Sequence, residues 1–278
     1  MEPCSEEPGK LDGAAGLTPD GAMNPEPSSR PSRWEWALAG LLAANLGATL
    51  LANGGYGARF EAYTALGSAL LFGVFAVSRL SASDGARRLH PAGWWPLPFV
   101  AYAIVHVVWI TPVPWLGRRD LSLWVQMAVV FWVALNGLPS RATRRWVFYT
   151  LVAVAFVGVL IGCHQVFSEP GWRIAGPARP GEQVGRATGP FSVANSFAGL
   201  LILLLPAVAA RAARPGASAA FRVWWLWISL VLLAGLVLTL SRGAWLALAL
   251  AAAVSPLLAA RLTWRRRAAW SAGIVVVV

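Results

Sequence analysis

The sequence has little cysteine, little histidine and few charges, and each shortage excludes a class of protein. Its 2 cysteines are Cys4, near the start, and Cys163, inside an apolar run, so no disulfide framework holds the fold. Its 3 histidines, His90, His106 and His164, lack the spacing of metal ligands. We therefore expect neither a metal site nor a cofactor.

Only 13% of the residues are charged, whereas 57% are hydrophobic and 16 are tryptophan. A soluble domain of 278 residues could not bury so much apolar surface. The net charge of +11 does not indicate a nucleic-acid partner, because the arginines stand between apolar runs and do not form one stripe. The composition indicates a membrane protein whose partner is the lipid bilayer.

The chain begins with a polar segment. Residues 1–33 combine Glu, Asp, Pro, Gly and Ser with few large apolar side chains, which predicts a disordered cytoplasmic tail. It lacks the basic segment, apolar stretch and small-residue cleavage site of a signal peptide. Residues 34–278 are expected to form the transmembrane helical domain.

Apolar segments of nearly membrane-spanning length follow one another from Trp34 onward. At about 1.5 Å per residue, roughly 20 residues cross a hydrocarbon core of roughly 30 Å. The predicted spans are residues 34–52, 63–80, 96–113, 121–139, 146–166, 190–210, 223–240 and 244–260. The prediction is an all-α fold, a polytopic membrane helical bundle of about eight full spans. A partial ninth span begins near residue 268, and an end at Val278 would leave carbonyls unpaired in hydrocarbon, so we expect a fragment of a longer protein.

The distribution of arginine predicts the orientation of these spans. With the tail in the cytoplasm, thirteen arginines lie in inner loops and seven in outer loops. The seven outer ones are Arg59, Arg118, Arg119, Arg173, Arg179, Arg186 and Arg242. The bias predicts a cytoplasmic N-terminus, with loops 168–188 and 241–243 outside.

Two short stretches each place an arginine at the edge of an apolar segment, and two membrane crossings separate them. They are Arg186-Ala-Thr-Gly-Pro-Phe-Ser-Val-Ala-Asn195 and Thr239-Leu-Ser-Arg-Gly-Ala-Trp245, so Arg186 and Arg242 are expected on one membrane face. Loop 168–188 is rich in proline and glycine and is expected to be irregular. Pro190 suits the first turn of the next helix, whose unpaired N–H groups, with Arg186 one turn before them, predict an anion site.

Polar residues follow within the predicted sixth span. Ser192, Asn195, Ser196 and Gly199 recur at i, i+3, i+4 and i+7 and predict one polar helix face. Small residues at this spacing most often let helices pack closely, which is the interpretation we favour for all of them except Asn195. A carboxamide in lipid needs partners, so Asn195 is expected to face the bundle interior.

Arg242 is the only charged residue between Val223 and Ala260. Alone, it fits an interfacial anchor as well as a functional group. Its pairing with Arg186 favours function, because guanidinium groups hold phosphate oxygens through two parallel N–H bonds. His164, near the outer end of the fifth span, is expected to be a solvated side chain more often than a general base.

At these residues the chain resembles the O-antigen ligase and O-antigen polymerase superfamily of bacterial envelope proteins. The resemblance rests on Arg186-Ala-Thr-Gly-Pro-Phe-Ser-Val-Ala-Asn195-Ser-Phe-Ala and Leu238-Thr-Leu-Ser-Arg242-Gly-Ala-Trp-Leu-Ala, and it covers about residues 185–260. Family members commonly have Asn-Pro-Asn where this chain has Val193-Ala-Asn195.

The resemblance implies a GT-C-type helical fold in the bacterial inner membrane. It implies transfer of a glycan from an undecaprenyl-pyrophosphate carrier to a lipid or sugar acceptor, without a metal, in O-antigen or exopolysaccharide assembly. Arg186 and Arg242 would be catalytic, binding the donor pyrophosphate and stabilising the leaving group, and Asn195 and Ser241 would bind substrate. The family's catalytic histidine lies after the span where this chain stops, so the fragment is expected to be inactive.

Two other functions fit a polytopic bundle. A transporter of a small anion such as bicarbonate is one, although it predicts broken helices in corresponding halves of the chain. Only the segment 96–113, near Pro112 and Pro114, is interrupted. A non-catalytic envelope scaffold is the other.

Overall fold

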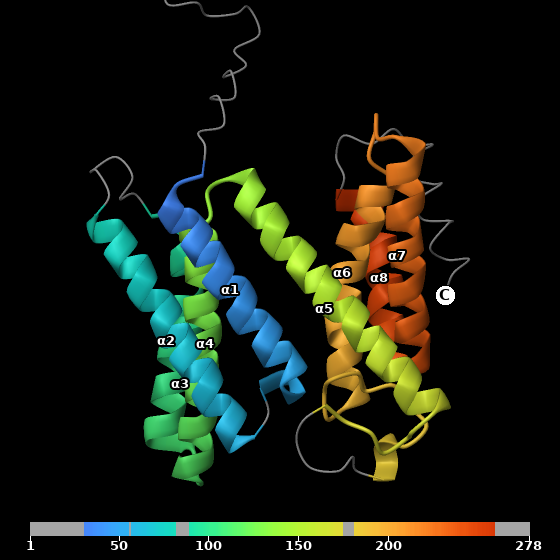
Figure 1. Cartoon of the computed structure of the whole chain (residues 1–278). Helices are drawn as coiled ribbons and strands as arrows, with labels where there is room; N and C mark the ends of the chain where they lie inside the picture. Colours follow the sequence, from blue (N-terminus) through green and yellow to red (C-terminus); the bar gives the residue numbers. More distant parts are fainter. Residues whose placement is uncertain (1–30, 56, 82–88, 175–180, 259–278) are drawn as a thin grey trace, which may run out of the picture. The chain divides into compact units, whose positions relative to one another are not determined.

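The computed structural model describes residues 31–55, 57–81, 89–174 and 181–258, and no strand occurs among them (Figure 1). The predicted all-α class is confirmed. Almost all of the predicted tail and the whole of the predicted ninth span lie outside the described residues.

Eight α-helices make up most of the described chain. They are α1 (Arg33–Leu51), α2 (Ala58–Leu80), α3 (Pro96–Val105), α4 (Pro114–Gly137), α5 (Arg141–Phe167), α6 (Ala194–Ala212), α7 (Ala219–Leu238) and α8 (Arg242–Leu258). Short turns of helix are η1 (Asn53–Gly55), η3 (Pro91–Trp94), η4 (His106–Ile110) and η5 (Gly181–Gln183). Serine side chains begin α1, α5 and α7 by accepting a backbone N–H from the first turn, which fixes where these helices start.

Six helical segments of the described chain are long and apolar enough to cross a membrane. They correspond to the predicted second to seventh spans, and they support a multi-pass membrane protein. Helix α1 is not among these six, and Arg242–Val254 in α8 is a shorter apolar helix. Helix α3 continues as η4 to Ile110 and Pro114 begins α4, so the break expected near Pro112 is present.

Helix α5 is shared by two groups of packed helices, and Figure 1 shows it lying between them. One group is α1, α2 and α4, whose buried residues Leu42, Leu71 and Val133 pack with Val147 of α5. The other is α6, α7 and α8, which bury Phe197, Leu201, Leu232 and Leu248 against Val159 of α5. Gly235 lets α7 approach α5 closely, because a Cβ there would lie 2.5 Å from Cγ2 of Val159.

The antiparallel course of these helices gathers four helix ends. The end of α5, the start of α6, the end of α7 and the start of α8 lie together, and we call this the site end (Figure 1). The backbone N–H of Ala187, before α6, donates to the carbonyl of Leu238, at the end of α7, over 2.8 Å. Arg186 and Arg242 therefore lie at the same end of the bundle, as the two intervening crossings predict.

Candidate anion-binding site

A buried glutamine fixes the loop between α5 and α6. Gln165 is 0% exposed, and its Nε2 donates to the carbonyls of Gly189 at 2.8 Å and Trp172 at 3.2 Å. Its Oε1 accepts from the backbone N–H and the hydroxyl of Thr188, at 3.1 and 3.2 Å. All the hydrogen-bonding capacity of the carboxamide is used, so Trp172, Thr188 and Gly189 of the loop are held against α5. Gln165 was not among the predicted site residues, although a carboxamide inside an apolar span is a signal for such a role.

Arg186 lies in this loop and contacts both neighbouring helix ends. Its Nε donates to the carbonyl of Thr239 at 2.9 Å, and its Nη2 donates to Oδ1 of Asn195 at 3.1 Å and to the carbonyl of Leu240 at 3.5 Å. The carbonyls belong to the turn that ends α7, where the helix dipole is negative and a cation is stabilising. Arg186 therefore joins the α5–α6 loop, the α7–α8 turn and the start of α6.

The turn between α7 and α8 is tight and strained. Leu240 has a φ of 51°, in the left-handed region that a bulky side chain rarely adopts. Buried Thr239 holds the turn, because its hydroxyl donates to Leu236 at 2.7 Å and accepts the N–H of Ser241 at 3.3 Å. Strain of this kind persists where the surroundings enforce it, and it is common at functional sites.

The start of α6 differs from the prediction. The helix begins at Ala194, so Pro190 precedes it and Arg186 is not one turn before it. The chain turns at Gly189, which has a left-handed φ of 55°, and the side chain of Gln183 then accepts the first helical N–H over 3.1 Å. These tertiary contacts set the helix start.

For the same reason, only Asn195, Ser196 and Gly199 of the predicted polar face lie in α6, where all three are exposed. Ser192 lies before the helix, where its hydroxyl donates to Oδ1 of Asn53 at 2.7 Å and accepts from Nη2 of Arg173 at 2.8 Å. Burial lowers the pKa of Arg173. Asn195 is exposed, not turned to the bundle interior, because it is in the first turn beside Arg186.

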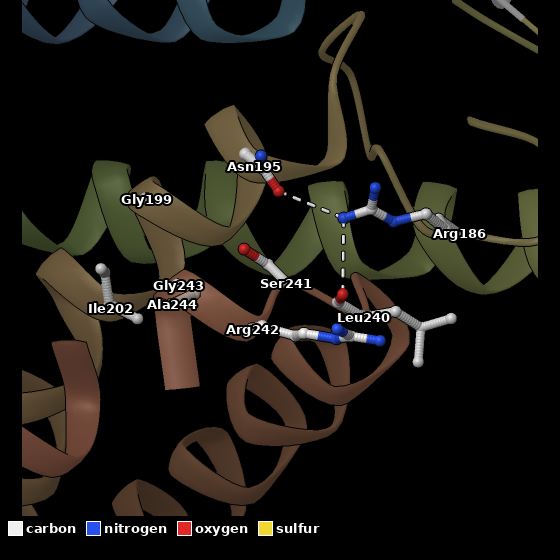
Figure 2. A pocket seen from close by; sticks show the side chains of 9 residues that line it. All are labelled: Arg186, Asn195, Gly199, Ile202, Leu240, Ser241, Arg242, Gly243 and Ala244. Atoms are coloured by element: carbon white, nitrogen blue, oxygen red, sulfur yellow. Dashed lines mark hydrogen bonds between the residues drawn. The ribbon is translucent and has the colours of Figure 1, made fainter. Parts of the chain in front are cut away.

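One cavity at the site end brings the predicted site residues together. It has a volume of about 650 Å³. Its lining residues are Arg186, Asn195, Gly199, Ile202, Leu240, Ser241, Arg242, Gly243 and Ala244 (Figure 2). All four predicted site residues, from two separate motifs, are among them, and none of the acidic residues that the structure describes is.

Several donors of this cavity are available to a ligand. Arg242 is exposed, and within the described chain no group pairs with its guanidinium. The hydroxyl of Ser241 points into the cavity in Figure 2 and has no hydrogen-bond partner among the described residues. The backbone N–H groups of Asn195, Arg242 and Gly243, in the first turns of α6 and α8, likewise have no hydrogen-bond partner among the described residues. These groups suit an anion.

The sequence patterns did not lead us to predict that the start of α8 also contributes to this cavity. Two helix N-termini, not one, meet the cavity, and each carries about half a positive charge. The signal in the sequence is Ser241 directly before Arg242, because serine is a preferred residue just before a helix. Together with two arginines, the helix ends make the cavity suited to a ligand with more than one negative charge.

His164 lies apart from this cavity. It is exposed, 3.6 Å from a carboxylate oxygen of Glu169, and its ring meets that of Trp172 edge-on at 5.2 Å. It does not line the cavity. Among the residues that the structure describes, no group of His, Cys, Asp and Glu could hold a metal ion.

Comparisons with known proteins identify no relative of this chain. No protein-family model, no curated protein and no solved structure matches the chain. The interpretation of the site therefore rests on its residues and geometry.

Proposed function

We propose that the cavity at the site end binds the pyrophosphate of an undecaprenyl-linked glycan, and that the chain belongs to a membrane ligase or polymerase of glycan assembly similar to the O-antigen ligase superfamily. One observation carries the proposal. Arg186, Asn195, Ser241 and Arg242 come from two motifs that α6 and α7 separate, and they line one cavity.

The charge of the cavity fits a pyrophosphate better than a small monoanion. Two arginines and two helix N-termini, less about half a charge for the C-terminal end of α7, sum to about +2.5, and no acidic side chain among the described residues lines the cavity. Bicarbonate carries a single negative charge and would leave most of the positive charge of the cavity unbalanced. The volume of about 650 Å³ also lies within the range of roughly 300–1,000 Å³ typical of sites for small molecules and cofactors.

The surroundings of the cavity suit a lipid-linked donor. Leu203 of α6 and Leu246 and Leu250 of α8 are 74%, 72% and 66% exposed, so both helices that lead away from the cavity present apolar side chains. In a bilayer these side chains face hydrocarbon. A polyprenyl chain beside them would leave its pyrophosphate at the helix ends.

The two arginines then have different tasks. Arg242 is available to hold the pyrophosphate oxygens through two N–H bonds. Arg186 is held by the carbonyls of the α7–α8 turn, which fixes its positively charged guanidinium group at the cavity wall. Positive groups fixed in advance stabilise the charge that grows on a leaving pyrophosphate. In this proposal the bundle is GT-C-like with eight spans in the bacterial inner membrane, its N-terminus is cytoplasmic and its site end faces outward.

Binding of the carrier tests the proposal without requiring turnover. The full chain is placed in phosphatidylcholine nanodiscs, and the affinity for fluorescent undecaprenyl pyrophosphate is measured. Arg242→Gln should weaken binding by about tenfold or more, as expected for loss of a charged hydrogen-bonding group. Arg118→Gln, which changes an exposed arginine near the start of α4, is the matched control.

Two outcomes would contradict the proposal. One is equal affinity of the wild type and Arg242→Gln, with both proteins folded. The other is displacement of the carrier by millimolar bicarbonate but not by inorganic pyrophosphate, which would favour the small-anion transporter.

A further inference from the structure

A second basic cavity lies between the start of α5 and the end of α6, far from the site end. Its volume is about 430 Å³, and its lining residues are Arg141, Arg144, Arg145, Phe148, Ala207 and Arg211. Four of these six residues are arginine and none is acidic. Helix α6 contributes Asn195, Gly199 and Ile202 to the first cavity and Ala207 and Arg211 to this one, so the two cavities share no lining residue.

Three of the arginines occupy an unfavourable position. Arg141, Arg144 and Arg145 lie in the first turns of α5, where the helix dipole is positive and acidic residues are usual. Arg144 donates to the carbonyls of Pro139 and Ser140, but within the described chain Arg141 and Arg145 have no partner. The repulsion among these charges is relieved when an anion enters the cavity.

One carboxylate is close to the start of α5, but it is already engaged. Glu35 of α1 is buried, and its Oε1 accepts the backbone N–H of Ser140 at 2.7 Å and the hydroxyl of Thr143 at 2.6 Å. It forms no ion pair with the cavity arginines among the described residues. A surplus of positive charge therefore remains on the cavity side of the helix.

The fourth arginine is fixed in place. The guanidinium of Arg211 lies 5.0 Å from the ring centre of Phe148, 5.2 Å from that of Tyr149 and 5.6 Å from that of Trp225. Its Nη1 donates to the hydroxyl of Tyr149 at 2.8 Å. A cation held by three aromatic rings has lost its side-chain freedom in advance, which lowers the entropic cost of binding an anion.

Aromatic side chains place this cavity at headgroup depth. Trp146 of α5 is 42% exposed and meets Trp36 of α1 edge-on at 6.4 Å, and Trp34 is 44% exposed. Exposed tryptophans at the ends of apolar helices mark the boundary between hydrocarbon and water. The four arginines thus lie where lipid phosphates lie, and Ala207 of α6 gives the cavity an apolar wall.

We propose that this cavity binds the phosphate headgroup of an anionic phospholipid. Clusters of basic residues between the ends of membrane helices are suited to such headgroups. The proposal does not depend on the glycan carrier, because it uses other residues at the other end of α6.

Native mass spectrometry of the full chain tests it. The protein is equilibrated in detergent micelles that contain equal amounts of phosphatidylglycerol and phosphatidylcholine, and the retained lipids are counted. The wild type should retain phosphatidylglycerol preferentially. The Arg141→Gln/Arg145→Gln double variant should lose about fivefold in preference for each arginine removed, and because neither side chain has a described partner, its fold should be unchanged.

The controls separate a lipid site from general charge. Arg214→Gln/Arg222→Gln removes two exposed arginines near the same end that do not line the cavity, and it should keep the preference. Arg211→Gln should lower the preference as well, with its melting temperature measured in parallel. Equal retention of both lipids by the wild type, or equal loss in the double variant and its control, would overturn the proposal. Displacement of phosphatidylglycerol by millimolar inorganic phosphate would assign the cavity to a soluble anion instead.

Discussion

Arg186 and Thr239 are joined by a hydrogen bond of 2.9 Å from the guanidinium Nε to the backbone carbonyl. This bond links the two sequence motifs directly, because each residue belongs to one of them. It also gives Arg186 a structural task at the end of α7, whereas Arg242 has no such contact within the described chain. Two arginines that look equivalent in the sequence are therefore unequal in the structure.

Arg186→Lys should destabilise the protein. A lysine keeps the positive charge but cannot donate to Thr239, Leu240 and Asn195 from one planar group. We expect a loss of about 1–2 kcal/mol and a melting temperature lower by about 2–8 °C, measured by thermal unfolding in nanodiscs. Arg242→Lys should unfold like the wild type. Equal melting temperatures for all three proteins would show that the contacts of Arg186 contribute nothing to stability.

The helices were predictable because their apolar segments have the length that a bilayer requires. Six of the eight predicted spans are confirmed as apolar helices of spanning length. The common position of Arg186 and Arg242 was predictable too, because two antiparallel crossings return the chain to the same end. These inferences need only periodicity and length.

The start of α6 was not predictable from local sequence. Pro190 looks like the first residue of a helix, but Gln165 on α5 pins the backbone at Gly189, and Gln183 supplies the acceptor for the helix start at Ala194. These contacts connect residues that are distant in the sequence, and a local pattern does not contain them. The same applies to Ser192, whose partner Asn53 lies in η1.

Ser241→Ala should separate binding from stability. The hydroxyl of Ser241 lines the cavity without a described partner, so its removal should leave the melting temperature unchanged. A hydroxyl donating to a phosphate oxygen should be worth about tenfold in affinity for undecaprenyl pyrophosphate. Titration with the fluorescent carrier measures this. Unchanged affinity would remove Ser241 from the site, and Ser229→Ala, in the middle of α7, controls for loss of a serine elsewhere.

Gln165→Leu should loosen the loop that holds Arg186. The substitution leaves the Thr188 N–H and hydroxyl and the Gly189 carbonyl buried without their partner. Each buried polar group left without a hydrogen-bond partner costs about 1–3 kcal/mol of folding stability, so a marked fall in melting temperature is expected. Limited proteolysis should cut the α5–α6 loop of the variant faster than that of the wild type. An uncut loop with wild-type stability would show that the network is dispensable.

Gly235→Ala tests the close contact between α5 and α7. Its Cβ would lie 2.5 Å from Cγ2 and 3.2 Å from Cγ1 of Val159, so α5 and α7 must separate or Val159 must shift. Overpacking of this kind costs about 1–3 kcal/mol. The double variant Gly235→Ala/Val159→Ala should recover part of the loss in thermal unfolding. A melting temperature of Gly235→Ala at or above that of the wild type would mean that the interface between α5 and α7 accommodates the added methyl group without strain.

Gly199→Leu offers the sharpest test of the cavity, because it changes the shape of the site and none of its charges. Gly199 lies on α6 in the cavity wall, and a Cβ placed there meets no atom within 4 Å. The helix should tolerate leucine, which favours helical structure by up to about 1 kcal/mol over glycine, so the melting temperature should not fall. The larger side chain should nevertheless occupy the space between Asn195 and the start of α8 and weaken carrier binding. Gly199→Ala should have a smaller effect in the same direction. If the leucine variant binds undecaprenyl pyrophosphate as tightly as the wild type, the ligand lies outside this cavity, and the two arginines are interfacial anchors.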